Sequence, residues 1–402
     1  MHQSGEERQR RKSAAVIVAL IIFFCFLASL LIWLIKGQAQ ERISWETSSE
    51  TVHIAVEQET EDQIVLEGAG EGTDGATEET DGTVAADAAA EEPAEPAGQQ
   101  PEPITLLFAG DVYLSNHVLN AYDQAGGIHG VLDDSIRQEI GAADYFMVNQ
   151  EFPFSDRGTA AEDKQFTFRL PVARVPVLQE MGIDMVTLAN NHALDFGAEA
   201  LLDTCAALEQ AGIRYVGAGP DLERAKKLET VELKGKTIGF LGATRVIPEY
   251  SWTAGAGNPG MFSTYDPAPV LEEIKKAKEV CDYLVIYVHW GVEKSEQPEE
   301  YQRTMGRQFI DAGADLVIGS HPHVLQGIEY YKDKPIVYSL GNFVFGSRIP
   351  QTMLLKAVLS DEGTRLEMIP CQSAAGYTTR ITDPARVQEF HQKMESLGEN
   401  LE

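Results

Sequence analysis

The segment Asp315-Leu-Val-Ile-Gly-Ser-His-Pro-His323 places two histidines directly behind a short apolar run. Residues 316–318 are apolar and β-prone, which predicts a buried strand. Alternate side chains of an extended chain point the same way, and Pro322 stiffens the spacer, so His321 and His323 can converge on one point. Neutral imidazole is a common ligand of zinc and iron. The pair alone is equally compatible with a metal site and with two solvated histidines.

Four more apolar runs end in groups that can bind a metal or take part in catalysis. Residues 104–109 lead to Asp111, residues 143–148 to Glu151, residues 184–189 to Asn191 and His192, and residues 283–288 to His289. Each has a structural alternative on its own, such as a helix cap or a buried polar residue. Together, oxygen and imidazole ligands without thiolates suit one or two divalent ions such as Mn, Fe or Zn. Two such ions would polarise a phosphoryl or similar oxygen and supply the attacking hydroxide.

Other polar residues are candidates for catalysis and substrate binding. In the segment Asn190-Asn-His-Ala-Leu-Asp-Phe-Gly197, His192 can serve as an acid, and Asp195 can orient its ring. Arg169 could clamp an anionic substrate oxygen, although a structural salt bridge is the more frequent role for such an arginine. Asn342 follows the last strong strand signal and is a second candidate for substrate binding.

The N-terminal part of the chain has a different composition. Residues 13–35 are apolar and uncharged, are long enough to cross a bilayer, and follow basic residues. They predict a transmembrane signal anchor, with residues 1–12 in the cytoplasm and the rest of the chain outside the cell. Residues 36–102 are acidic and poor in apolar groups, which predicts a disordered linker. We expect a folded domain over residues 103–372 and a helical C-terminal tail over residues 373–402.

The charge balance argues against a nucleic-acid partner. The chain has 62 acidic and 32 basic residues, of which 20 and 6 lie in residues 1–102, so the remainder has a net charge of −16. A nucleic-acid surface would need basic patches that neutralise phosphates. The four cysteines have no paired spacing, so neither a disulfide framework nor a cysteine zinc site is indicated.

The order of the motifs resembles that of the CapA, or poly-γ-glutamate capsule biosynthesis, family of the calcineurin-like metallophosphoesterase superfamily. The matching segments extend from residue 104 to about residue 345. They are Phe108-Ala-Gly-Asp111, Asn149-Gln-Glu151, Ala189-Asn-Asn-His192 with Asp195-Phe-Gly197, His289-Trp-Gly291, Gly319-Ser-His-Pro-His323 and Ser339-Leu-Gly-Asn-Phe343.

The resemblance implies an α/β fold of four layers, an α/β/β/α sandwich with two sheets between helices. It assigns the metal ligands by position: Asp111 and His323 to a first ion, Glu151 as the bridge, and Asn191, His289 and His321 to a second ion. It also implies that His192 protonates the leaving group. One departure is Tyr113, since metallophosphoesterases typically have a histidine two residues after the first aspartate. This puts a complete first site, and ordinary two-metal phosphatase activity, in doubt.

The resemblance also implies a role in the production or attachment of capsule or poly-γ-glutamate. The first hypothesis is a metal-dependent hydrolase or transferase that acts on an anionic envelope polymer such as poly-γ-glutamate. The second is a non-catalytic membrane subunit that binds and guides the polymer, and the third is a plain phosphoesterase. The expected partners are the cell membrane, the polymer and other membrane subunits of a synthase complex, with no nucleic acid among them.

Overall fold

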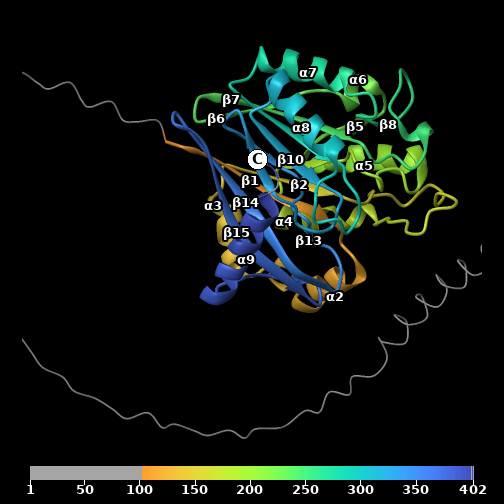
Figure 1. Cartoon of the computed structure of the whole chain (residues 1–402). Helices are drawn as coiled ribbons and strands as arrows, with labels where there is room; N and C mark the ends of the chain where they lie inside the picture. Colours follow the sequence, from red (N-terminus) through yellow and green to blue (C-terminus); the bar gives the residue numbers. More distant parts are fainter. Residues whose placement is uncertain (1–101, 400, 402) are drawn as a thin grey trace, which may run out of the picture. The chain divides into compact units, whose positions relative to one another are not determined.

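The computed structural model describes residues 102–399 and 401, which fold around two β-sheets (Figure 1). The expected anchor, residues 13–35, and nearly all of the expected linker, residues 36–102, lie outside the described residues. Within the described part of the chain, no helix has both the length and the apolar character needed to cross a membrane.

The first sheet has eight strands and combines parallel and antiparallel pairing. Its parallel part consists of β1 (Ile104–Val112), β2 (Tyr145–Gln150), β3 (Met185–Thr187), β4 (Arg214–Val216) and β13 (Asn342–Val344). Its antiparallel part consists of β14 (Arg348–Ser360), β15 (Gly363–Ala374) and β16 (Tyr377–Arg380). Central parallel strands are buried on both faces, which explains the nearly continuous apolar runs of β1 and β2.

The second sheet has six strands in the order β11-β12-β10-β9-β7-β6. Its parallel strands are β7 (Lys236–Thr244), β9 (Tyr283–His289), β10 (Leu316–Ser320) and β12 (Lys334–Val337). Its antiparallel edges are β6 (Glu229–Leu233) and β11 (Ile328–Tyr331). A separate two-stranded ribbon pairs β5 (Ala218–Gly219) with β8 (Gly260–Met261).

The helices lie outside the two sheets. On the outer face of the first sheet, one apolar cluster joins it to α2 (Asn116–Ala125), α3 (Asp134–Ala142), α4 (Val175–Glu180) and α5 (Gly197–Ala211). On the outer face of the second sheet, another cluster includes residues of α6 (Leu222–Ala225), α7 (Ala268–Lys278) and α8 (Glu300–Ala312). Figure 1 shows α7 and α8 at the top of the view and α2 at the bottom. Three 3₁₀ turns complete these connections: η1 (Ile128–Gly130), η2 (Val172–Arg174) and η3 (Tyr250–Trp252).

The space between the sheets is the third apolar cluster of the domain. Phe108 and Met147 of the first sheet pack there with Phe240 and Tyr287 of the second, and all four are fully or almost fully buried. Because side chains of a strand alternate between its faces, the neighbours of these residues point outward to the helices. The expected α/β class and the four-layer order are therefore present in the described residues.

The C-terminal segment completes this core. Asp383 caps α9 (Pro384–Gly398), and its side chain accepts a hydrogen bond of 3.0 Å from the amide of Arg386. The helix of the expected C-terminal tail therefore begins at residue 384 and not at residue 373. Phe390 and Met394 of α9 are buried in the cluster between the sheets. The expected domain boundary at residue 372 falls inside β15, and β16 extends the same sheet by backbone hydrogen bonding.

The connection from β12 of the second sheet to β13 of the first lies closely against β1 near the end of that strand. A Cβ atom at Gly110 would lie 1.8 Å from the carbonyl oxygen of Gly341, so only glycine fits there. The same carbonyl accepts a 2.9 Å hydrogen bond from the amide of Asp111. The carboxyl ends of parallel strands share one edge of a sheet, which is where ligand sites of α/β folds usually form. The predicted site residues follow these strand ends.

Candidate metal centre

The structure brings together the predicted metal ligands from both sheets. Asp111 lies on β1 and Glu151 follows β2, while His289 ends β9 and His321 and His323 follow β10. Asp111, Glu151 and His289 are completely buried, and the two other histidines are buried almost fully. Asp111 lies within its strand and not behind it, because β1 continues beside β13 as far as Val112.

His321 and His323 converge for a different reason than the sequence suggested. The strand β10 ends at Ser320, so alternation along a strand does not direct the two side chains. Both histidines instead have positive φ angles, 100° for His321 and 57° for His323. Positive φ is uncommon for residues other than glycine and costs on the order of 1–3 kcal/mol, and such residues cluster at functional sites.

Several buried polar atoms in this site have no hydrogen-bond partner within the described residues. They are Oδ2 of Asp111, both carboxylate oxygens of Glu151 and Nδ1 of His321. Oδ2 of Asp111 lies 3.2 Å from Nδ1 of His323, but without the alignment of a hydrogen bond. A buried carboxylate oxygen without a donor is costly, so a cation is the partner that this arrangement fits.

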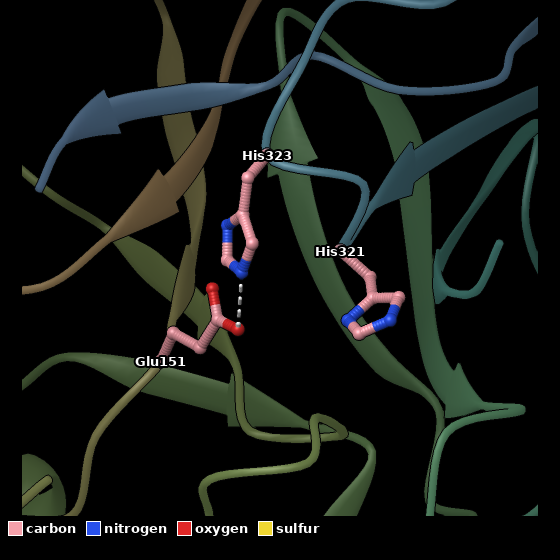
Figure 2. Close-up of side chains that lie close together, drawn as sticks. All are labelled: Glu151, His321 and His323. Carbon is pink, nitrogen blue, oxygen red and sulfur yellow. Dashed lines mark ion pairs between the residues drawn. The ribbon is translucent and has the colours of Figure 1, made fainter. Parts of the chain in front are cut away.

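Glu151, His321 and His323 form the tightest donor group. Each offers one ligand atom, and these atoms all lie within 4.8 Å of one another. Figure 2 shows that the carboxylate of Glu151 and the ring of His323 point toward one another, with the ring of His321 beside them. Nε2 of His323 lies 3.7 Å from Oε1 of Glu151. One carboxylate and two imidazoles form a donor set that suits Mn, Fe or Zn.

Asn342 holds the ring of His323 in place. Its side-chain oxygen lies 2.8 Å from Nδ1 of His323, so we assign the ring proton to Nδ1, which leaves Nε2 facing Glu151. A histidine that binds a metal commonly donates its other N–H to such a carbonyl or carboxylate oxygen. The structure thus gives Asn342 an orienting contact, and its role in binding substrate stays a prediction.

His289 and Asn191 lie on the other side of Glu151. Nε2 of His289 is 2.8 Å from Oδ1 of Asn191 and 3.9 Å from Oε1 of Glu151. Nδ1 of His289 is 3.0 Å from the hydroxyl oxygen of Ser320, which fixes the other edge of the ring. Two of the three residues that the resemblance assigns to the second ion, Asn191 and His289, are therefore neighbours in space.

Two buried amides connect the strand ends, and sequence reasoning did not mark either as a site residue. Asn149 donates a hydrogen bond of 2.8 Å to Oδ1 of Asp111, and Asn190 donates one of 2.9 Å to the side-chain oxygen of Asn149. Asn190 also accepts a hydrogen bond of 3.1 Å from the amide of His192. Both asparagines occur inside the matched motifs, directly beside predicted site residues, and that position was the signal that could have identified them.

The pKa values of the site residues agree with a cation site. Burial and the neighbouring histidines lower the pKa of His289 well below its usual range and that of His321 to about 3, so both rings keep their lone pairs at neutral pH. Burial, with Asp111 nearby, raises the pKa of Glu151 well above its usual value. Burial also acts to lower the pKa of His323, but Glu151 and Asp111 outweigh it and raise that pKa to about 9. Without a metal, the site therefore retains a proton that a cation would displace.

His192 and Asp195 form the pair expected from their spacing. Nδ1 of His192 lies 2.6 Å from Oδ2 of Asp195, and both side chains are buried. The amide of Phe168 donates a 2.6 Å hydrogen bond to the same oxygen, and the Phe168 ring stacks on His192 with 4.2 Å between ring centroids. Burial lowers the pKa of His192. A third side chain, Lys164, contacts this pair, and nothing in the sequence pattern marked it.

Arg169 and Tyr113 lie next to Phe168, the residue whose ring stacks on His192. The exposed Arg169 donates to the carbonyl of Arg157 and lies 4.0 Å from the ring centroid of Phe196. It has no ion pair among the described side chains, so a cation–π contact replaces the expected salt bridge, and its role as an anion clamp stays a prediction. Tyr113 stacks on Phe168 with 4.0 Å between ring centroids. The position that the resemblance expects to hold a histidine is therefore part of an aromatic stack.

Comparison with known proteins agrees with the motif order. The family model of the bacterial capsule synthesis protein PGA_cap matches residues 105–347. The chain is 35% identical over 277 residues to the "PGA biosynthesis protein CapA" of Bacillus subtilis, a match that covers 66% of this chain and 71% of the relative. It is 31% identical over 296 residues to the "Capsule biosynthesis protein CapA" of Bacillus anthracis, covering 70% of each chain.

Similarity to solved structures is much weaker. The NAD nucleotidase of Haemophilus influenzae has a TM-score of 0.40 at 12% identity, over 72% of this chain and 62% of the other. The sulfate thiohydrolase SoxB of Thermus thermophilus has a TM-score of 0.41 at 13% identity, over 75% and 62%. These scores are too low to support an argument. The family match and the relatives above 30% identity are sufficient, and the chain belongs to the bacterial capsule synthesis protein family PGA_cap.

Proposed function

We propose that this protein is a membrane-anchored, metal-dependent hydrolase or transferase that acts outside the cell on an anionic envelope polymer such as poly-γ-glutamate. Family membership supports the link to capsule and poly-γ-glutamate biosynthesis. One observation carries the metal-dependent part: ligand atoms of Glu151, His321 and His323 lie within 4.8 Å of one another, at a place where buried polar atoms have no hydrogen-bond partner within the described residues. A site of this kind is expensive to bury unless a cation completes it.

The residues have separate roles in this proposal. Glu151, His321, His323 and Asp111 would hold one divalent cation, and Asn191 and His289 would provide ligands for a second. This proposal groups His321 with the first ion, whereas the resemblance assigns it to the second. Bound divalent cations supply Lewis-acid polarisation of a carbonyl or phosphoryl oxygen. His192 donates Nδ1–H to Asp195, so its Nε2 is free to take up a proton from the attacking water and then to pass that proton to the leaving group.

A non-catalytic polymer-binding subunit of a synthase complex is the second candidate function. Tyr113 favours it, because a phenol stacked on Phe168 replaces the histidine that a complete first site would have. In this role the cation would bind carboxylates of the polymer, and His192 would have no proton to transfer. Other membrane subunits would then carry out the chemistry.

Polymer output in cells separates the two candidates. If the site is catalytic, both His321→Ala and His192→Ala reduce polymer production or attachment. The first does so through lost metal, and the second through lost turnover, on the order of 10²-fold. Full polymer output with His192→Ala, together with no output with His321→Ala, would show that His192 transfers no proton. The protein would then be the non-catalytic polymer-binding subunit.

The cellular location is a proposal from the sequence of residues 13–35. A single-pass anchor in the cell membrane, with residues 1–12 in the cytoplasm, places the site where an envelope polymer is found. Protease added to intact protoplasts should release a soluble fragment that contains the folded domain. A fragment that stays protected until lysis would show that this orientation is wrong.

A further inference from the structure

Lys164 reaches the candidate acid from the loop that precedes Phe168. Its ammonium group contacts Oδ1 of Asp195 and the backbone carbonyl of Asn191, and Nζ lies 3.1 Å from Nδ1 of His192. These three partners lie 27 to 31 residues away in the sequence. The lysine therefore ties the loop to the motif that supplies the acid and one predicted metal ligand.

The surroundings of Lys164 differ from those of a surface lysine. Its side chain is only 14% exposed, and Nζ lies 5.3 Å from the centre of the Trp252 ring, which is itself buried. Lys276 on α7 is a useful contrast, because it also contacts two carboxylates but is 55% exposed. An exposed ion pair contributes little to stability, whereas a buried charge must be paired to persist.

The hydrogen bonds of Asp195 define what the lysine does. Oδ2 of Asp195 accepts hydrogen bonds from Nδ1–H of His192 and from the amide of Phe168, while Oδ1 accepts one from Lys164. Because Nδ1 of His192 carries its own proton in this arrangement, the ammonium group cannot donate to that nitrogen as well. Its donors go to Oδ1 and to the carbonyl of Asn191, which fixes the rotation of the carboxylate.

We propose that Lys164 is a positioning residue for the acid. It holds the Asp195 carboxylate so that Oδ2 faces Nδ1 of His192, which keeps the proton on Nδ1 and leaves Nε2 available to the reacting group. It also compensates the buried charge of Asp195. This inference rests on the proposed catalytic function, and it assigns to Lys164 no contact with substrate.

Three substitutions in the full-length chain test it. Lys164→Met removes the charge at similar length, Lys164→Arg keeps the charge, and Lys276→Met is the matched control on the surface. Turnover is measured on poly-γ-glutamate and on the phosphodiester probe bis(p-nitrophenyl) phosphate, with Mn²⁺ added, together with the metal content. We expect Lys164→Met to lower kcat roughly 10- to 100-fold, within the range for a misplaced general acid, with KM and metal content unchanged. Lys164→Arg should recover most of the loss, and Lys276→Met should have none.

A spectroscopic signature decides the inference without turnover. In ¹⁵N-histidine NMR spectra, with His192 assigned by its substitution, the wild-type ring should show the Nδ1–H tautomer alone. Lys164→Met should show a mixture of both tautomers, and Lys164→Arg the wild-type pattern. If wild type turns over neither substrate, the proposed function fails, and the tautomer pattern still tests Lys164.

Three results would overturn the inference. The first is an unchanged His192 tautomer in Lys164→Met, and the second is an unchanged kcat where wild type is active. The third is a loss of metal in parallel with the loss of turnover, since Lys164 would then support the Asn191 loop and not the acid. If Lys164→Met does not fold, Lys164→Gln keeps a donor without the charge and gives the same comparison.

Discussion

The eight-stranded sheet brings carboxylates and amides to the site, whereas the six-stranded sheet brings imidazoles. Asp111, Glu151 and Asn191 belong to the first group, and His289 and His321 to the second. We refer to these as the oxygen side and the imidazole side, and His323 belongs to the latter. His192 is the exception on the first sheet, and its ring is bound to Asp195.

The two sides differ in charge as well as in the type of donor. Asp111 and Glu151 are two buried carboxylates, and no lysine or arginine in the described residues forms an ion pair with either. On the imidazole side, the pKa values of His289 and His321 are lowered, so of these three rings only His323 is positively charged at neutral pH. A divalent cation would accept both the carboxylate oxygens and the imidazole lone pairs as ligands, so metal binding is predicted to depend on residues of both sides.

The largest loss of metal affinity is expected from Glu151→Gln, which removes a carboxylate ligand from the oxygen side. Both oxygens of Glu151 lack partners, so this change removes a primary ligand, and metal affinity in calorimetric titration should fall by more than about 100-fold.

Glu329→Gln is the matched control for that change. Glu329 is equally buried, but it is bound by Arg307 at 2.6 Å and by the hydroxyl of Tyr338 at 2.6 Å. Its substitution should lower the melting temperature and leave metal affinity unchanged. Equal metal affinity of Glu151→Gln and wild type would contradict the cation site.

His192→Gln tests whether His192, the one histidine assigned to the oxygen side, transfers protons and does not bind metal. The side chain contacts Asp195 and none of the three donors Glu151, His321 and His323, so metal affinity should be unchanged. Turnover of bis(p-nitrophenyl) phosphate or poly-γ-glutamate should fall by about 10²-fold, as for the loss of a general acid. Loss of metal from this variant would mean that His192 is a ligand and that the division of roles is wrong.

A smaller loss of metal affinity is expected from Asn342→Ala, which removes the hydrogen bond that orients His323 on the imidazole side. The amide oxygen orients His323 at 2.8 Å, and loss of such a partner typically costs 10- to 100-fold in metal affinity. Asn258→Ala, in a loop where the amide bonds only backbone carbonyls, is a suitable control. If Asn342→Ala binds metal as wild type does but has a raised KM, then its predicted role in substrate binding is correct instead.

The smallest effect is a change in pH dependence of the metal-free protein. The pKa of His323 is raised from 6.5 to about 9, so its stabilising contribution is complete below pH 6.5 and is lost as the pH rises through about 9. Melting temperatures between pH 6 and 10 should therefore decline less in His323→Gln than in wild type. Added Mn²⁺ should remove the difference in slope, because the metal replaces the proton. Parallel curves for the two metal-free proteins would contradict the assigned charge.

Much of this arrangement could be predicted from the sequence because it is encoded locally. Apolar runs identify the strands, and the polar residue at each strand end marks the site, as for Glu151 and His289. The positions that escaped prediction depend on tertiary structure. Lys164 meets Asp195 through a loop without periodicity, and the turn at His321 and His323 has positive φ angles that no pattern signals. The contact of Asn342 with His323 exists because β13 pairs with β1 beside Asp111.

Elemental analysis of the purified full-length chain tests the central claim most directly. After incubation with Mn, Fe or Zn and removal of free ions, wild type should retain at least one ion per chain. His321→Ala should retain far less, since it removes one of the three closest donors, and His192→Gln should retain as much as wild type. A wild-type chain without bound metal, or a His321→Ala chain with the full amount, would contradict the account.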